Sequence, residues 1–363
     1  MGDTVAISPR VHRNAFDLLR LIAASIVIFS HAYALLGLPD GPIVHFVEYI
    51  GAGGLGVGIF FSLSGYLNAR SVRRHAVTEF YIFRALRIFP ALIVNLVFTA
   101  CLIGPFVTTL ATFDYFRDHQ VWSYVLRGAT LSIHESLPGV FAGNRYPNAV
   151  NASLWTLPGE FALYLLLPLS QLARDRAGHA NIAAAVFFAA VHLIALGPAG
   201  LSDYHLGFGP LRWISADAAM FFVGAALASF DLPFGQARIA AAALGLFAVT
   251  LNAAYSELST LITLPLATVA IGSLRTEALA PREDISYGLY IYAFPIQQLV
   301  YDKLHLVVSS VALFGISTLI AATAALLSWR LVEKPIIDRR WRLSQQLHGW
   351  LGLPRPVRVH ENP

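Results

Sequence analysis

Residues 16–36 read FDLLRLIAASIVIFSHAYALL, an apolar run long enough to cross a bilayer that nevertheless carries Asp17, Arg20 and His31. A charged side chain at the centre of a membrane helix costs about 2.5–3.5 kcal/mol on insertion scales, so such groups usually face a protein interior or a wet cavity. At about 100° per residue, His31 lies within roughly 20° of Arg20 around the helix, and Asp17 lies about 40° from the same line. One stripe of one predicted membrane helix therefore carries an acid, a guanidinium and an imidazole.

The composition of the whole chain indicates a membrane protein. Of its 363 residues, 56% are hydrophobic and 13% are charged, whereas an average soluble protein has roughly 25% charged residues. About twenty apolar residues are needed to cross a bilayer as a helix. We therefore predict an all-α, polytopic membrane protein with ten transmembrane helices, near residues 16–37, 53–69, 88–110, 154–173, 180–197, 213–230, 236–253, 258–274, 286–304 and 308–331.

Basic residues are concentrated in alternate loops of this arrangement. With the N-terminus in the cytoplasm, nineteen arginines and lysines fall on the cytoplasmic side and five on the outer side. Because cytoplasmic loops carry an excess of arginine and lysine, we predict that both termini are cytoplasmic. The positive charge is spread over several loops rather than gathered in one patch, which argues against a nucleic-acid partner.

A single membrane domain over residues 1–340, followed by a short cytoplasmic tail over 341–363, is expected from this pattern. The first apolar run is not followed by a small-residue cleavage signal, so we expect it to be retained as a helix. Cys101 is the only cysteine, which excludes a disulfide framework and a cysteine-based metal site. The longest outer segment, 111–153, is expected either to cap the outer mouth or to hold a re-entrant piece.

His31 and Glu160 are predicted to lie at a similar depth in the bilayer. A rise of 1.5 Å per residue places His31 about 21 Å along the helix from Asp17, in the outer third of a core of ~30 Å. The fourth helix runs in the opposite direction, which places Glu160 roughly 10 Å below the outer surface. An imidazole and a carboxylate at one level could act as a general base and its orienting partner. The alternative is a structural hydrogen bond between two helices.

Arg84 and Arg87, in FYIFRALRIFP, share one face just before the predicted third helix. They are expected at the cytoplasmic surface, near the end of the first helix that carries Arg20. Three guanidiniums at one place would suit the phosphates of a nucleotide-type co-substrate. The alternative is that these arginines only extend to the membrane surface, as most arginines at such positions do.

Two further groups of residues allow both a functional and a packing interpretation. The glycine-rich start of the second helix predicts close helix packing through Gly54 and Gly58 rather than a phosphate-binding loop, because no strand precedes it. Ser64 in the same helix is available for a hydrogen bond to a neighbouring helix. Tyr287 and Tyr290, in the ninth predicted helix, either line a sugar or acyl site or serve as packing residues.

Taken together, these motifs resemble the membrane acyltransferase-3 family of bacterial O-acyltransferases, and the resemblance covers nearly the whole chain. Arg20 and His31 are similar to the R-x10-H signature of that family, and Arg84 and Arg87 to its R-x-x-R motif. Four further elements resemble the family in the same order: GVGIFFSLSGYL at 56–67, which contains Ser64; NASLWTLPGEF at 151–161, which contains Asn151, Trp155 and Glu160; SYGLYIYAFP at 286–295; and the Glu333-Lys334-Pro335 ending.

The resemblance implies ten helices in a bacterial inner membrane and transfer of an acyl group, commonly acetyl from acetyl-CoA, to a hydroxyl of an extracytoplasmic glycan or lipid-linked sugar. It implies an acyl-CoA co-substrate and no metal. The chain departs from the family in two ways. Many members have a histidine at the position of Ala293, and many continue into a soluble hydrolase-like domain that we do not find here.

The leading hypothesis is a membrane O-acyltransferase with His31 as general base or transient acyl carrier and Glu160 as its orienting partner. Arg20, Arg84 and Arg87 are the expected donor-binding residues. Two alternatives remain open: a transporter or flippase that uses the intramembrane charges as a substrate or proton path, and a non-catalytic membrane subunit that holds a glycan. Substrate-binding or structural roles are expected for Asp17, Ser64, Asn151, Trp155, Tyr287, Tyr290 and Glu333.

Overall fold

The chain folds as an assembly of helices, seen here in a computed structural model that describes residues 14–39, 51–133, 136–147, 149–197, 201, 204–205, 209–230, 232–251, 256–275, 281, 283–304 and 309–350. The helices are α1 (Phe16–Leu36), α2 (Gly51–Val72), α3 (Val77–Phe98), α4 (Gly104–Val107), α5 (Thr112–Arg117), α6 (His119–Gly128), α7 (Thr156–Leu166), α8 (Ala177–Leu196), α9 (Leu211–Leu227), α10 (Ala237–Thr250), α11 (Ser256–Gly272), α12 (Ser286–Leu304), α13 (Ser310–Ser328), α14 (Lys334–Asp338) and α15 (Arg340–Trp350).

Several of these helices have the length and apolar character of membrane spans. Within the described residues, four helical stretches are long and apolar enough to cross a membrane, namely Phe16–Leu36, Val77–Val107, Ala152–Leu196 and Ser310–Asp338. Helices α10 and α11 are apolar but shorter. The all-α, polytopic class is thus confirmed, whereas the number of ten spans and the cytoplasmic placement of both termini stay predictions.

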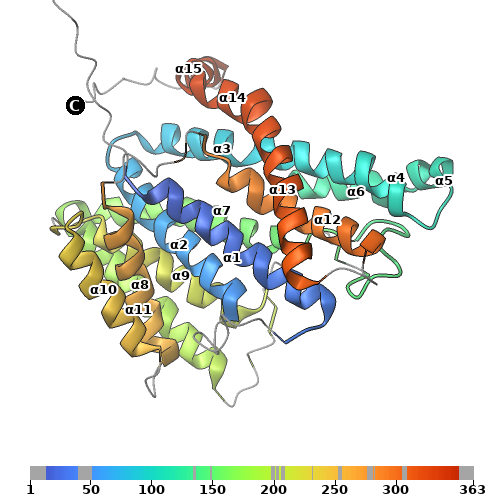
Figure 1. Ribbon diagram of the computed structural model, residues 1–363. Helices are drawn as coiled ribbons and strands as arrows, with labels where there is room; N and C mark the ends of the chain where they lie inside the picture. The colour runs from blue at the N-terminus through green and yellow to red at the C-terminus, as the bar shows by residue number, and fades with distance from the viewer. Residues whose placement is uncertain are drawn as a thin grey trace, which may run out of the picture.

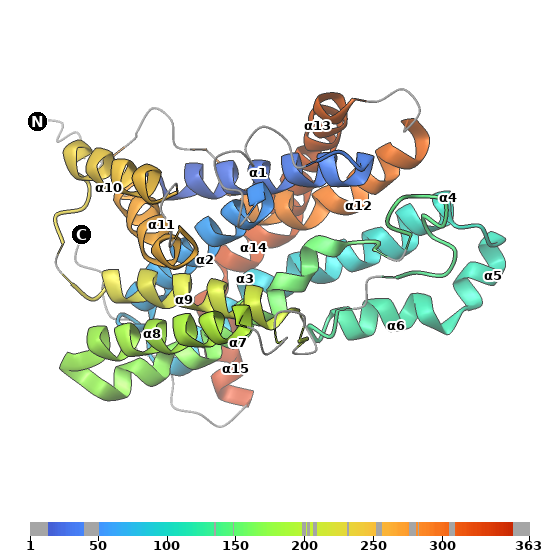
Figure 2. The same ribbon diagram turned by 90° about the horizontal axis from the view of Figure 1, so that it is seen from below.

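Helix α1 packs against α2 and α12 (Figure 1), and in Figure 2 it runs along one edge of the assembly. Its buried face is made of small and branched side chains that include Ala23, Ala24 and Val27. Gln297 of α12 donates a hydrogen bond of 2.8 Å from Nε2 to the carbonyl oxygen of Ile28. This contact ties α12 to α1 three residues before His31.

Two other groups of helices lie beside α1. Helix α11 packs against α9, and α10 packs against α11, so that side chains of all three helices form a second apolar core. At the opposite side, α4, α5 and α6 form an arm that projects from one end of the assembly (Figure 2). The arm is tied to the rest by Tyr115, whose hydroxyl donates to the carbonyl oxygen of Ala100 at 2.8 Å. It occupies much of segment 111–153, for which a cap or a re-entrant piece is predicted.

Glycines allow α2 to approach its neighbours closely. A Cβ atom at Gly65 would overlap the backbone of Phe221, and a Cβ at Gly224 would overlap the backbone of Ser62, so α2 and α9 cross at backbone contact. Gly58 also packs closely, against Leu264 and Met220. Close packing through glycine is therefore confirmed at Gly58, whereas Gly54 lines cavities instead.

The third helix begins earlier than the sequence predicts. It starts at Val77 rather than near 88, because the Glu79 carboxylate accepts the backbone N–H of Ala76 at 2.6 Å and satisfies a donor at the helix start. The charges of Arg84 and Arg87 lower the hydropathy of this first part, which led to the late prediction. Both arginines therefore lie within α3 and not before it.

The predicted fourth helix, 154–173, is divided into three pieces. A 3₁₀ turn (Ala152–Trp155) precedes α7, and a 3₁₀ segment (Leu167–Arg176) follows it. Pro168 lacks the N–H that would continue the α-helix, and Arg174 adopts a positive φ of 49° before α8 begins. The prediction for the ninth helix, 286–304, coincides with α12.

The C-terminal residues that the structure describes pack back onto the helices. Helix α15, within the predicted tail, lies against α3: His348 Nε2 is 3.3 Å from Thr78 Oγ1, and the ring of Trp341 is 5.0 Å from that of Phe83. Residues 351–363 of the predicted tail lie outside the described residues.

Candidate active site

Two neighbouring cavities follow α1 through the protein. His31 lines one of them, and Arg20, nearer the start of the helix, lines the other. We call them the histidine cavity and the arginine cavity. Two of the three ionisable residues on α1 therefore face space inside the protein, as the insertion cost of such residues leads us to expect.

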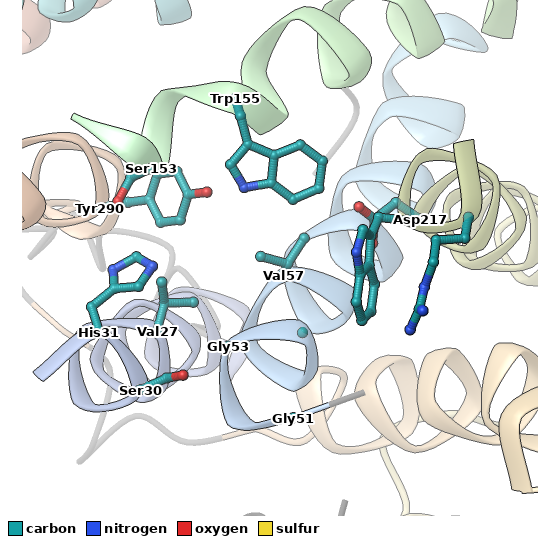
Figure 3. A pocket seen from close by; sticks show the side chains of 13 residues that line it. Val27, Ser30, His31, Gly51, Gly53, Val57, Ser153, Trp155, Asp217 and Tyr290 are labelled. Atoms are coloured by element: carbon teal, nitrogen blue, oxygen red, sulfur yellow. The ribbon is translucent and has the colours of Figure 1, made fainter. Parts of the chain in front are cut away.

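The histidine cavity has a volume of about 450 Å³. Figure 3 shows the imidazole of His31 and the indole of Trp155 directed into it, with Asp217 on the side away from His31. Its lining comes from α1, α2, the turn before α7, α9 and α12: Val27, Ser30, His31, Gly51, Gly53, Gly54, Val57, Ser153, Trp155, Arg212, Trp213, Asp217 and Tyr290.

The imidazole of His31 packs against an aromatic ring. The ring of Phe294 meets it edge-on, with 4.9 Å between the ring centres and 89° between the ring planes. The Nδ1 atom of His31 is buried and has no hydrogen-bond partner among the described residues. No described residue therefore engages this ring nitrogen.

Three residues of α9 complete the histidine cavity, and the sequence analysis missed them. Asp217 is buried, with 7% of its surface exposed, and Arg212 stacks on Trp213 with 4.4 Å from Cζ to the ring centre. The sequence contains a sign of one of them. Asp217 is an acid within the apolar run WISADAAMFF, and α1 was recognised by the same feature, ionisable residues within an apolar run. The cavity therefore holds an acid and a base beside two indole rings.

The arginine cavity is smaller, about 120 Å³, and combines charged groups with apolar walls. It lies among α1, α2, α3, α7 and the start of α12. Its lining consists of Arg20, Val57, Phe60, Phe61, Ser64, Leu67, Asn68, Arg84, Arg87, Ile88, Thr156, Leu157, Glu160, Tyr164, Ser286, Tyr287 and Tyr290. The three arginines of the sequence prediction are thus brought to one place.

Two of these arginines are engaged by carboxylates. Arg20 pairs with Asp17 at 2.6 Å and lies 3.6 Å from Asp284. Arg87 pairs with Asp284 at 2.6 Å and lies 3.4 Å from Glu333. Burial alone would raise the pKa of Asp284, but the guanidiniums of Arg87 and Arg20 outweigh burial and lower it. Asp284 is therefore ionised at neutral pH and shared by both arginines.

Arg84 differs from the other two. It has no ion pair among the described residues, and its buried Nε atom has no hydrogen-bond partner there. Its nearest ring contact is Phe80, 6.0 Å from Cζ to the ring centre. A guanidinium that lines a cavity without a carboxylate partner is available to an anionic ligand.

Glu160 lies in the arginine cavity and not beside His31. Its carboxylate accepts hydrogen bonds from Ser64, at 2.7 Å, and from the hydroxyl of Tyr164. No hydrogen bond joins Glu160 to His31 in the described part of the chain. The prediction that these two residues form a pair is therefore wrong for this structure, because a similar depth in the membrane does not bring two helices together.

The remaining predicted residues are placed as follows. Asn151 is structural: its side chain amide donates to Asn95 Oδ1 at 3.1 Å and to the carbonyl oxygen of Ile291 at 2.9 Å. Tyr287 lines the arginine cavity and donates to the carbonyl oxygen of Ile88 at 3.1 Å. Ala293 is buried next to Phe294, so the position where many relatives have a histidine carries a packing residue here.

Among the residues that the structure describes, no group of three or more His, Cys, Asp or Glu side chains is positioned to hold an ion. The candidate site consists of two adjoining cavities of different chemistry, one lined by a histidine and the other by a set of arginines.

Comparison with known proteins identifies the class to which this site belongs. Residues 13–330 match the acyltransferase-3 family model, which describes an acyltransferase domain. The chain belongs to this family, and it is a multi-pass membrane acyltransferase. The resemblance inferred from the motifs is thus confirmed.

Two relatives match over most of their length. The O-acetyl transferase of Shigella phage Sf6 is 32% identical, over 90% of this chain and 96% of the relative. Nodulation protein 10 of Rhizobium leguminosarum bv. viciae is 30% identical, over 92% of this chain and 95% of the relative. No solved structure matches the chain. These relatives support an O-acyltransferase over a transporter or a non-catalytic subunit.

Proposed function

We propose that this acyltransferase moves an acetyl group from acetyl-CoA, held at the arginine cavity, to a hydroxyl group of a carbohydrate in the histidine cavity. One observation carries the proposal. Two adjoining cavities lie along the same helix, one supplied with guanidiniums and the other with an imidazole. A donor and an acceptor can thus approach each other from opposite ends of α1.

The donor side is supported by charge. The excess of arginine and lysine in one set of loops supports a cytoplasmic position for the N-terminal end of α1, where acyl-CoA is available. We place the protein in the bacterial cytoplasmic membrane on this basis. Arg84, the guanidinium without a carboxylate partner, is the anchor that we assign to a donor phosphate. Arg20 and His31 are roughly 16 Å apart along the helix, a distance that a pantetheine arm can cover.

The acceptor side is supported by the chemistry of the histidine cavity. Its volume of about 450 Å³ falls within the range of roughly 300–1,000 Å³ that is typical of small-molecule sites. Trp155 and Trp213 offer flat apolar surfaces, and Asp217 and Arg212 offer polar groups beside them. This combination suits a sugar, which has apolar C–H faces and a rim of hydroxyl groups.

The reaction needs a base beside the attacking hydroxyl, and we assign this role to His31. The imidazole takes the proton of the acceptor hydroxyl. At the same time the hydroxyl oxygen of the acceptor bonds to the carbonyl carbon of the thioester. The carbon–sulfur bond then breaks, and the proton passes from His31 to the sulfur of CoA. A positioned general base contributes about 10²–10⁴ in rate. The carboxylate of Glu160 accepts hydrogen bonds from Ser64 and Tyr164 in the arginine cavity. We assign to it the role of shaping the wall against which the donor lies.

The test is mass spectrometry of cell-surface glycans and secreted metabolites from cells with and without the gene. We expect the loss of one acetyl mass per modified site when the gene is absent or carries His31→Ala. His119→Ala is the matched control, because His119 is almost fully exposed, with a side chain 97% accessible, and lines neither cavity. Normal acetylation by the His31→Ala variant would overturn the assignment of the base.

A further inference from the structure

The two cavities meet at a single layer of side chains. Val57 of α2 and Tyr290 of α12 line both of them, and no other lining residue is shared. Both side chains are otherwise buried, with 8% and 7% of their surfaces exposed. Val57 and Tyr290, together with Thr156, form what we call the partition.

Three elements pass from one cavity to the other at the level of the partition. On α2, Gly54 lines the histidine cavity, and Phe60 lines the arginine cavity one to two turns later. At the start of α7, Trp155 lines the histidine cavity, whereas Thr156 lines the arginine cavity. Helix α1 makes the same change, whereas α12 reaches the histidine cavity only through Tyr290. The partition is therefore a boundary that several elements share rather than a chance contact of two side chains.

Tyr290 is held in place from two sides. Its hydroxyl is 2.9 Å from Thr156 Oγ1, in a hydrogen bond between two buried groups. Its ring meets the ring of Phe60 at 5.4 Å between centres and at 68° between planes. A hydrogen-bonded and packed tyrosine has little freedom to swing away. Val57, opposite it, is a β-branched side chain with one preferred rotamer in a helix.

The arginine cavity is small. Its volume of about 120 Å³ is well below the roughly 300–1,000 Å³ of a usual small-molecule site, so it has room for one end of a donor rather than for a whole compact ligand. Its apolar lining includes Phe60, Phe61, Ile88 and Leu157. An acyl group in this cavity therefore lies among carbon side chains and reaches the partition.

We propose that Val57 and Tyr290 set the length of the acyl group that this enzyme transfers. The inference rests on the proposed entry of the donor from the arginine cavity. An acetyl group fits between Val57 and Tyr290 with its carbonyl directed toward the histidine cavity, whereas each added methylene must displace one of these packed side chains. A single methylene in a closely fitted pocket changes selectivity by about 10- to 200-fold. The partition is thus the specificity-determining element for the donor.

Substitution of Val57 tests the proposal. Membranes from cells that carry the native acceptor, with each variant as the sole copy of the enzyme, are supplied with acetyl-CoA, propionyl-CoA or butyryl-CoA, and the released CoA thiol is measured. Val57→Ala should raise the kcat/KM ratio of butyryl-CoA to acetyl-CoA about ten-fold or more. Val57→Leu should lower the use of acetyl-CoA and abolish the use of the longer donors.

A matched variant separates this effect from a general loosening of the protein. Val72→Ala makes the same change in the same helix at a buried valine that lines neither cavity. We expect this variant to retain the donor preference of the wild type. Gel filtration in detergent confirms that each variant is folded.

The outcomes distinguish this inference from the proposed function. If the wild type uses acetyl-CoA but Val57→Ala and Val57→Leu both keep its donor preference, the inference fails and the proposed function stands. A shift in Val72→Ala as large as that in Val57→Ala also overturns the inference. If the wild type releases CoA from none of the three donors, the proposed function itself fails.

Discussion

Arg84 and Arg87 are three residues apart on one helix, yet the structure predicts opposite consequences for their loss. Arg87 is paired with Asp284 and Glu333, and only 1% of the surface of Glu333 is exposed. Removing one partner of a buried pair leaves an uncompensated charge and costs about 3–5 kcal/mol. Arg84 has no ion pair among the described residues, so Arg84→Ala should cost only about 1 kcal/mol of folding free energy.

For binding of the donor, we expect Arg84→Ala to have a larger effect than Arg87→Ala. A hydrogen bond to a charged group contributes about 1.5–3 kcal/mol, so the loss of the unpaired guanidinium should raise the KM for acetyl-CoA about 10- to 150-fold, at roughly 1.4 kcal/mol per factor of ten. Arg87→Ala should lower the Tm by about 6–10 °C, at ~2 °C per kcal/mol, with expression reduced accordingly.

The assay is thermal unfolding of each variant in detergent, followed by donor kinetics on the folded fraction. Arg70→Ala is the control, because Arg70 is exposed and, among the described residues, its side chain bonds to the hydroxyl of Tyr66 at 3.3 Å and lines neither cavity. The reasoning is refuted if Arg84→Ala lowers the Tm as much as Arg87→Ala. An unchanged KM for acetyl-CoA in Arg84→Ala would refute the assignment of Arg84 as the donor anchor.

Three further changes test other parts of the site. Asp217→Asn should leave the KM for acetyl-CoA unchanged and raise the KM for the acceptor about ten-fold, since Asp217 lines only the histidine cavity of the two; a change in donor KM alone would contradict this placement. Glu160→Gln should leave the pH profile of kcat unchanged, because Glu160 bonds Ser64 and Tyr164 rather than His31; a shifted profile would show coupling to the base. Asn151→Ala should lower the free energy of unfolding by about 1–3 kcal/mol through its lost buried hydrogen bonds, and an unchanged Tm would disprove its structural role.

Part of this site could be predicted from sequence because membrane insertion penalises charge. That rule singled out Arg20 and His31, and the structure shows each of them beside a cavity. The same rule applies to Asp217, but a single acid in an apolar run does not indicate which face of the helix it occupies. Arg84 and Arg87 were recognised as a pair, while their different environments depend on contacts made across the fold.

The errors have a common physical origin. Helical rise gives the depth of a residue in the membrane, but not which helices are neighbours, so His31 and Glu160 were paired although Glu160 bonds to Ser64. Asp284, which engages two arginines, lies in a loop before α12 without any periodic pattern. Val57 is an ordinary branched residue in an apolar helix, and only its position between two cavities makes it distinctive.

In the proposed reaction, the donor and the acceptor enter the enzyme from opposite faces of the membrane. Sealed vesicles of known orientation test this directly, because acetyl-CoA does not cross a lipid bilayer. Radiolabelled acetyl-CoA is offered to one face at a time, with wild-type and His31→Ala protein compared. We predict that label reaches the glycan acceptor only when acetyl-CoA is supplied at the cytoplasmic face, and only with His31 present. Transfer from acetyl-CoA supplied solely at the outer face would contradict the account.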